Sequence, residues 1–277
     1  MGKDAAELTE ALGYFAMQQV DYLAGPADCS EEEAATIAGW IKTQRTNDYT
    51  PKAVLPKVKA DSEGVVNFTT DEIKADGKTY NTAQYCSRIA GMLAGTPMTI
   101  SCTYAPLPEV TDIKRLTKVE MDAAIDAGEL ILYHDGEKVK IGRGVTSLTT
   151  LTVDKGEAFK KIKIVETVEM IRTDIRRTAQ DSFIGRYPNS YDNKCLLITA
   201  IKGYFEQLEA EGILARGKSE VRIDLEAQEL HLKAKGMDTS KMSEQEVKEA
   251  DTGSNVFLWA KISILDAVED ILLGIII

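Results

Sequence analysis

The sequence predicts an α/β protein, α+β overall, in which an open sheet with flanking helices precedes a smaller α+β C-terminal domain. Short β-rich runs alternate with helical segments over roughly the first hundred residues, a pattern typical of a sheet covered by helices. A long helical pattern near 159–183 then opens a part that ends in two apolar, β-rich runs. The Pro106–Leu107–Pro108 break predicts a boundary between domains of 1–110 and 111–277.

The first domain is expected to contain three helices and four strands. The second helix begins at Ser30, whose spacing to Glu33 forms a capping box. The third ends before Gly95 and Pro97. The expected helices are 5–17, 31–45 with the inward stripe Ala34, Ile37, Ala38 and Ile41, and 82–93. The expected strands are 20–24, 52–55, 65–69 and 98–104.

The second domain is expected to start with a short helix and a hairpin. Thr117 and Glu120 form a second capping box, which opens a helix that ends at Gly128. The runs 129–134 and 138–141 flank Asp135–Gly136 and predict a β-hairpin. A Thr-rich strand is expected at 145–153.

Two helices and a strand are expected next. The helix at 159–183 has an inward stripe of Ile162, Val165, Val168, Ile171, Ile175 and Ala179. The next helix begins near Asp192, ends at Gly212 and turns inward Leu197, Ile201, Phe205 and Leu208. A strand is expected at 221–225, and the polar stretch 230–250 predicts a surface loop or short helix.

The chain ends on an apolar, β-rich run, 271–277, with no charge in it. An unpaired apolar strand invites pairing with other chains, so this run is either buried in its own sheet or completes a neighbour's sheet. We expect 256–264 to be a strand of this subunit and 271–277 to be exchanged between subunits.

The composition excludes some partners. A net charge of −11 argues against wrapping nucleic acid, whose phosphates would repel the protein. Lys261, Asp266, Glu269 and Asp270 make membrane insertion of the C-terminal region costly. The N-terminus has no apolar stretch of signal-peptide length. The four cysteines are far apart, which predicts reduced, packed thiols.

Motifs of catalysis are missing from the sequence. There is no GxGxxG after a strand and no GxxxxGK[ST], so the two best nucleotide signatures are absent. His134 and His231 are interpreted as incidental surface residues, and neither Ser101–Cys102 nor Cys195 has a nucleophile's context. The acidic run 31–33 suits the first turn of a helix better than a metal site. We therefore predict no catalytic, cofactor-binding or metal-binding residues and no cofactor.

Four segments carry a family resemblance. They are EAFKKIKIVETVEMIRTDIRRTAQDSFIGRYPNSYDNKCLLITAIKGYFEQLEAEG at 157–212, VVNFTTDEI at 65–73, YCSRIAGMLAGTPMTISCTYAPLPEV at 85–110 and ILYHDGEKVKIGRGVTSLTT at 131–150. The first resembles the C-terminal domain of contractile tail sheath proteins, and the other three fit the same family in the same order. The similarity is greatest to sheaths of phages and phage-like particles of Gram-positive bacteria, and it covers nearly the whole chain.

The resemblance implies a structural and mechanical function. Sheath subunits stack as hexameric rings into a helical cylinder around an inner tail tube. A baseplate signal makes the cylinder contract, which drives the tube through a target cell envelope without nucleotide hydrolysis. It further implies a place in a virion tail or phage-tail-like particle that is assembled in the bacterial cytoplasm. The implied partners are other sheath subunits, the tube protein and the baseplate, without nucleic acid or membrane insertion.

The resemblance also implies where subunits meet. Terminal arms of the family lend strands to neighbouring subunits' sheets, which fits an exchanged C-terminal run. The long helix carries arginines on its outer face, which is either a solvated face or a docking surface for acidic residues. The expected intersubunit residues are Ile271, Leu272, Leu273, Ile275, Ile276, Ile277, Arg172 and Arg176. Sheath proteins of this kind carry additional N-terminal sequence, so this chain is expected to lack the N-terminal arm and part of the sheet.

Two alternatives stay open at this point. An α/β enzyme or small-molecule-binding protein would require a perturbed acid–base cluster in a deep pocket. Another tail component, such as a tube or baseplate protein, fits less well, because tube proteins are smaller and mainly β.

Overall fold

The computed structural model describes residues 5–276 and consists of two compact units. Unit 1 comprises the chain up to Glu166 together with the chain from Asp266 onward, and unit 2 comprises Thr167–Leu265. The expected boundary at residues 110 and 111 does not coincide with this division, because the strands at 110–112 and 129–130 both pair with earlier strands of unit 1.

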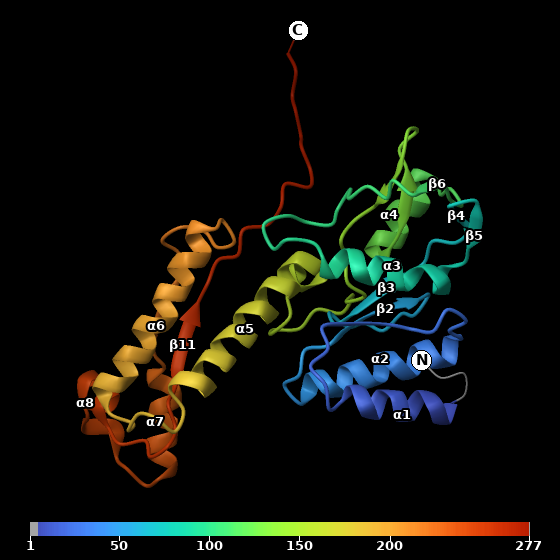
Figure 1. Cartoon of the computed structure of the whole chain (residues 1–277). Coiled ribbons are helices and arrows are strands. Elements are labelled where there is room, and N and C mark those ends of the chain that lie inside the picture. Colours follow the sequence, from blue (N-terminus) through green and yellow to red (C-terminus); the bar gives the residue numbers. More distant parts are fainter. Residues whose placement is uncertain (1–4, 277) are drawn as a thin grey trace. The chain divides into compact units, whose positions relative to one another are not determined.

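Unit 1 is built around a parallel sheet of four strands in the order β1-β2-β3-β7 (Figure 1). The strands are β1 (Tyr22–Ala24), β2 (Lys52–Pro56), β3 (Val65–Phe68) and β7 (Glu129–Leu130). Ala53 pairs with Val65 and Asn67 with Glu129 in this register. The predicted open α/β sheet is confirmed, although β7 comes from a segment that the sequence analysis assigned to the hairpin.

Helices cover both faces of this sheet (Figure 1). Successive residues of a strand point to opposite faces, and β2 follows this rule. Ala53 and Leu55 are buried against α1 (Ala5–Phe15) and α2 (Glu31–Thr46), whereas Val54 is buried in the cluster of α3 (Thr82–Ala94). The capping box at Ser30 begins α2, and its predicted stripe Ala34, Ile37, Ala38 and Ile41 is buried.

Two smaller antiparallel sheets and a short helix complete unit 1. The predicted hairpin is formed by β8 (Leu132–His134) and β9 (Val139–Ile141), and the capping box at Thr117 begins α4 (Lys118–Asp126). A three-stranded sheet in the order β5-β4-β6 was not predicted. Its strands are β4 (Ile73–Ala75), β5 (Lys78–Tyr80) and β6 (Val110–Asp112).

Two predicted strands of unit 1 are wrong. Segment 98–104 forms turns, and segment 145–153 makes only an isolated bridge between Val145 and Lys161. The β-branched residues of these segments favour strands. Several of their backbone N–H groups, however, donate to individual side chains and do not form a ladder with a neighbouring strand. The hydroxyl of Ser101 accepts from the Thr103 N–H at 3.1 Å, and the N–H groups of Thr149 and Thr150 both donate to Asp61 at 2.8 Å.

Unit 2 contains helices and a two-stranded antiparallel sheet. Helix α5 begins in unit 1 and continues into unit 2, and Ser190, two residues before Asp192, caps the next helix. The helices are α5 (Ile162–Ser182), α6 (Tyr191–Ala210), α7 (Leu225–Ala234) and α8 (Glu244–Glu249), with a 3-10 turn at Thr239–Lys241. A further 3-10 turn, Glu157–Lys160, precedes α5 in unit 1. The sheet pairs β10 (Glu220–Ile223) with β11 (Leu258–Lys261), which confirms that this run is a strand of the subunit itself.

Candidate assembly interface

The apolar residues at the C-terminus are exposed to solvent. From Ile271 to Ile276 the chain forms no helix or strand, and Figure 1 shows this red end extending away from the rest of unit 1. The side chains of Ile271, Leu272, Leu273, Ile275 and Ile276 are each at least 77% exposed, and Leu272 and Ile276 are 100% exposed. Ile277, also expected at the interface, lies outside the described residues. We call residues 271–276 the C-terminal arm; consecutive exposed apolar side chains of this kind mark an interaction site.

The small sheet of unit 2 has edges that could receive such an arm. Among the described residues, no third strand pairs with β10 or β11. A two-stranded sheet is marginally stable by itself, and an added strand would supply main-chain hydrogen bonds. Arg222 lies over the ring of Trp259 on this sheet, with the guanidinium carbon 4.3 Å from the ring centroid.

The C-terminal arm leaves unit 1 from a segment that ion pairs fix in place. Asp266 pairs with Lys161, and Asp270 pairs with Arg143. The arm therefore starts at a defined point on unit 1, directly after the residues that hold it.

The two arginines expected at the interface lie exposed on α5, in unit 2. Arg172 and Arg176 are four residues apart, so they share one face of the helix. Each also takes part in an interaction within the chain. Their position on the outer face is as predicted, whereas a docking function for them stays a prediction.

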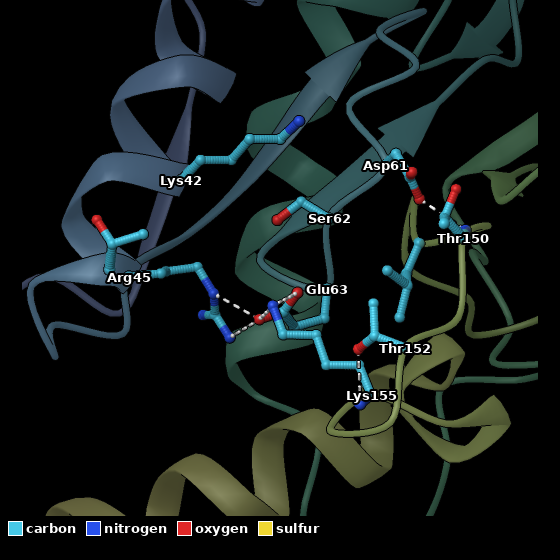
Figure 2. A pocket seen from close by; sticks show the side chains of 10 residues that line it. Lys42, Arg45, Asp61, Ser62, Glu63, Thr150, Thr152 and Lys155 are labelled. Carbon is cyan, nitrogen blue, oxygen red and sulfur yellow. Dashed lines mark hydrogen bonds and ion pairs between the residues drawn. The ribbon is translucent and has the colours of Figure 1, made fainter.

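Unit 1 also contains a hollow of about 310 Å³ between α2 and the segments 61–63 and 148–155 (Figure 2). Its central group is the buried carboxylate of Glu63, which pairs with Arg45 at 3.0 Å and with Lys155 at 2.8 Å. Burial alone would raise the pKa of Glu63, but the hydrogen bond from Lys155 and the charge of Arg45 bring it below its ordinary value. Hydrogen bonds from Thr150 and Thr149 also hold the pKa of Asp61 well below its usual range.

These carboxylates are poor candidates for acid–base catalysis. A general acid at neutral pH needs a raised pKa, whereas Glu63 and Asp61 are held in the ionised form by their partners. The arrangement in Figure 2 is that of a structural ion-pair network which joins α2 to the segment containing Lys155.

The remaining candidate nucleophiles and bases lie apart from this hollow. His134 accepts a hydrogen bond from the Gly136 N–H in the hairpin turn, and His231 is half-buried against Phe257 in unit 2. All four cysteines are free thiols, and burial raises the pKa of Cys102 to about 12, which disfavours its thiolate at neutral pH. Within residues 5–276 no group of three or more His, Cys, Asp or Glu side chains is arranged to hold a metal ion.

Membrane-spanning helices were also sought among the described residues 5–276. None of the helices there combines the length and apolar composition that a membrane span requires.

Comparison with known families decides between these interpretations. The family model of the phage tail sheath protein central domain matches residues 2–147, and that of the phage tail sheath C-terminal domain matches residues 154–276. The chain belongs to the phage tail sheath protein family. The resemblance carried by 157–212 and the three further segments is thus confirmed.

Individual sheath proteins agree with this assignment. The tail sheath protein of Clostridium phage phiCD119 is 44% identical over 254 residues, which cover 91% of this chain and 70% of that protein. The crystal structure of the sheath tail protein from Desulfitobacterium hafniense has a TM-score of 0.73 at 23% identity and covers 81% of this chain. This chain spans 55% of the length of that Desulfitobacterium protein. The anti-feeding prophage helical sheath in its contracted state has a TM-score of 0.71 at 16% identity, covering 100% of this chain and 76% of that one.

The residues that hold the root of the C-terminal arm in this sheath-family chain were not predicted from the sequence. From the sequence, Asp266, Glu269 and Asp270 were recognised only as charges that oppose membrane insertion. Their partners Arg143 and Lys161 are more than a hundred positions away along the chain. A concentration of carboxylates directly before an apolar end was the available signal, but sequence alone does not say where such carboxylates bind.

Proposed function

We propose that this chain is a structural subunit of a contractile tail sheath, which polymerises as stacked hexameric rings around an inner tube. Contraction of the sheath drives the tube through a target cell envelope, and the energy comes from subunit packing. The proposed partners are other copies of the chain, the tube protein and the baseplate, in a virion tail or phage-tail-like particle assembled in the bacterial cytoplasm.

The observation that carries the proposal is the C-terminal arm, a run of exposed apolar residues in a chain of the sheath family. We propose that each arm adds as a strand to the β10–β11 sheet of a neighbouring copy. Main-chain hydrogen bonds would hold the arm, and its alternating side chains would set the register. Because the donor and acceptor surfaces differ, the contact is head-to-tail and continues from copy to copy, which generates helical polymers.

Assembly of the purified protein tests this proposal. We expect negative-stain electron microscopy of the full-length sheath subunit to show hollow, striated rods once the protein is concentrated. Particles that stay monomeric at every concentration, with the arm equally accessible to protease throughout, would count against polymerisation through this arm.

A nucleotide-hydrolysing enzyme would release phosphate from ATP, whereas we expect this protein not to hydrolyse ATP. The expected rate of phosphate release equals that of buffer alone, because the ionised carboxylates of the hollow in unit 1 already have partners. The matched control is Lys155→Ala, which alters the most exposed cation of that ion-pair network. Turnover by the wild-type protein that disappears in Lys155→Ala would favour the enzyme alternative over the sheath.

A further inference from the structure

Residues 266–270 return to unit 1 directly after the chain leaves unit 2 at Leu265. We propose that Asp266–Asp270 is a strap, which fixes the root of the C-terminal arm to its own unit 1 and leaves only the residues from Ile271 onward available to a neighbour. This inference rests on the proposed function, because it concerns the control of the segment that is proposed there to be exchanged.

Glu269 is the centre of the strap. Its side chain is only 10% exposed, and its Oε1 atom accepts hydrogen bonds from the hydroxyls of Ser101 at 3.0 Å and Thr103 at 2.5 Å. Its Oε2 atom pairs with Arg143 at 3.3 Å and with Lys161 at 3.2 Å. Both oxygens of one carboxylate are therefore engaged by three separate segments of unit 1.

Hydrogen bonds within unit 1 fix the loops that bind Glu269 relative to one another. The Thr103 hydroxyl that donates to Glu269 also accepts from the N–H of Gly144 at 3.0 Å, which joins the two receiving loops. The N–H of Ile162 donates to the Gly144 carbonyl at 3.0 Å, so the start of α5 is joined to the same place. A Cβ atom on Gly144 would lie 2.6 Å from the sulfur of Cys102, so the close approach of these loops depends on a glycine there.

The flanking carboxylates extend the contact on both sides of Glu269. Asp266 pairs with Lys161 and Asp270 with Arg143, while the buried Lys163 adds a further positive charge that faces Asp266 and Glu269. The side chain of Val268, between them, is 84% exposed. The strap thus binds by its charges, and no apolar side chain of it needs to be buried.

The environment keeps Glu269 ionised at neutral pH. Burial opposes ionisation, but hydrogen bonds from Thr103, Lys161 and Ser101 more than offset it, so the pKa of Glu269 lies below its ordinary value. Release of the strap would exchange these charge-assisted hydrogen bonds, which are roughly twice as strong as neutral ones, for contacts with water, and this opposes release.

The strap restricts the reach of the arm. Freeing residues 266–270 would lengthen the mobile chain by roughly 17 Å, since an extended chain spans about 3.3–3.6 Å per residue. A fixed root instead gives every copy the same starting point for its arm, which suits a regular lattice of subunits.

Nuclear magnetic resonance relaxation of the full chain tests the strap, with deuterated, 15N-labelled protein at neutral pH. In the wild-type protein we expect backbone order parameters of residues 266–270 close to the rigid value of about 0.85. In Glu269→Gln we expect them to fall below about 0.6, the range of the exposed arm. Glu244→Gln is the matched control, because it makes the same change at a side chain that is 69% exposed and belongs to unit 2, outside the strap.

The outcomes separate this inference from the proposed function. Unchanged order parameters in Glu269→Gln would overturn the strap, whatever the arm does in assembly. If Glu269→Gln also loosens the parallel sheet, Thr103→Val decides by the same criterion, because it removes a donor from the receiving side. A chain lacking residues 271–277 that still forms normal rods would overturn arm exchange and leave the strap standing.

Discussion

Deleting residues 271–277 is expected to leave the subunit folded and to abolish the linkage between rings. The described side chains of the C-terminal arm are at least 77% exposed, so their removal takes almost nothing from the core of unit 1. In the assembly, each Leu or Ile that becomes buried on a neighbour contributes about 1.5–3 kcal/mol. Three such side chains on one face of a strand would contribute roughly 5–9 kcal/mol, more than a thousandfold in association.

Circular dichroism and negative-stain electron microscopy measure the two halves of this prediction. The truncated protein should keep the wild-type helical signal and form no rods at concentrations where the wild-type protein does. Normal cylinders from the truncated protein would show that the arm is dispensable.

A matched pair of point variants distinguishes strand pairing of the arm from nonspecific hydrophobic contact. Ile275→Pro keeps an apolar side chain but removes a backbone N–H, so it should weaken assembly if the arm pairs as a strand. Ile275→Val keeps the N–H and most of the side chain and should assemble like the wild-type protein. Equal assembly by both variants would argue against main-chain pairing at this position.

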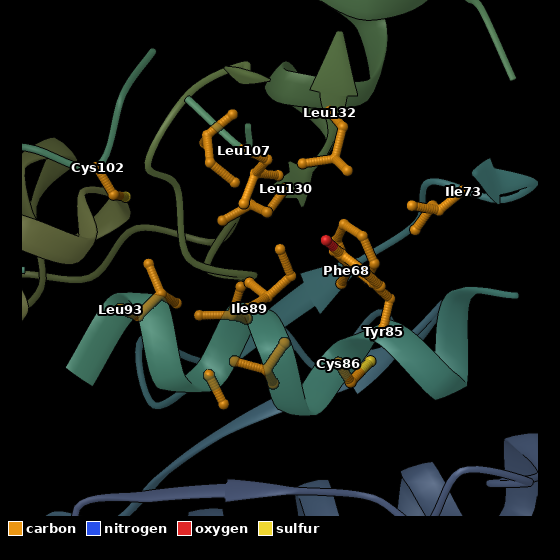
Figure 3. Close-up of a cluster of buried hydrophobic side chains, with 14 of the residues drawn as sticks. Phe68, Ile73, Tyr85, Cys86, Ile89, Leu93, Cys102, Leu107, Leu130 and Leu132 are labelled. Atoms are coloured by element: carbon orange, nitrogen blue, oxygen red, sulfur yellow. The ribbon is translucent and has the colours of Figure 1, made fainter. Parts of the chain in front are cut away.

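Replacing Leu130 by Ala is expected to lower the free energy of unfolding of unit 1 by about 2–5 kcal/mol. Leu130 is fully buried in β7, and Figure 3 shows it among Phe68, Ile89, Leu107 and Leu132 above helix α3. The shorter side chain would leave a cavity that this close-packed cluster can fill only partly.

Urea denaturation followed by tryptophan fluorescence measures this effect. The chain has two tryptophans, Trp40 in α2 of unit 1 and Trp259 in β11 of unit 2. A Trp259→Phe background therefore makes the signal specific to unit 1. The matched control is Leu272→Ala, at a side chain that is 100% exposed, which should leave the transition unchanged. Equal midpoints for the two variants would contradict the assigned core.

Local chemistry predicted much of the fold correctly. The capping boxes at Ser30 and Thr117 and the alternation of β runs with amphipathic helices depend on residues within a few positions of one another, so the sequence suffices to find them. The missed hairpin of β4 and β5 had such a signal too. It turns at Asp76–Gly77, both with positive φ, which is the residue pair that favours this turn.

The wrong strands at 98–104 and 145–153 depended on partners far away in the sequence. Ser101 and Thr103 are alternating polar residues in a β-rich run, yet their hydroxyls bind Glu269 more than 160 positions later. Thr149 and Thr150 likewise donate to Asp61. Strand propensity cannot detect such contacts, because it considers only neighbours along the chain.

The C-terminal arm illustrates the opposite case. Its composition predicts a strand, but the single chain offers it no partner, and residues 271–276 stay exposed without a ladder. The sequence pattern favours a strand, yet the single subunit does not form one. The two findings agree if the strands that pair with the arm belong to another copy, as we propose.

Near-atomic electron cryomicroscopy of assembled rods tests the central claim most directly, because it shows where residues 271–276 lie. The account predicts that they form a strand hydrogen-bonded to the β10–β11 sheet of a neighbouring subunit. Rods in which these residues remain exposed, or fold back onto their own subunit, would contradict it.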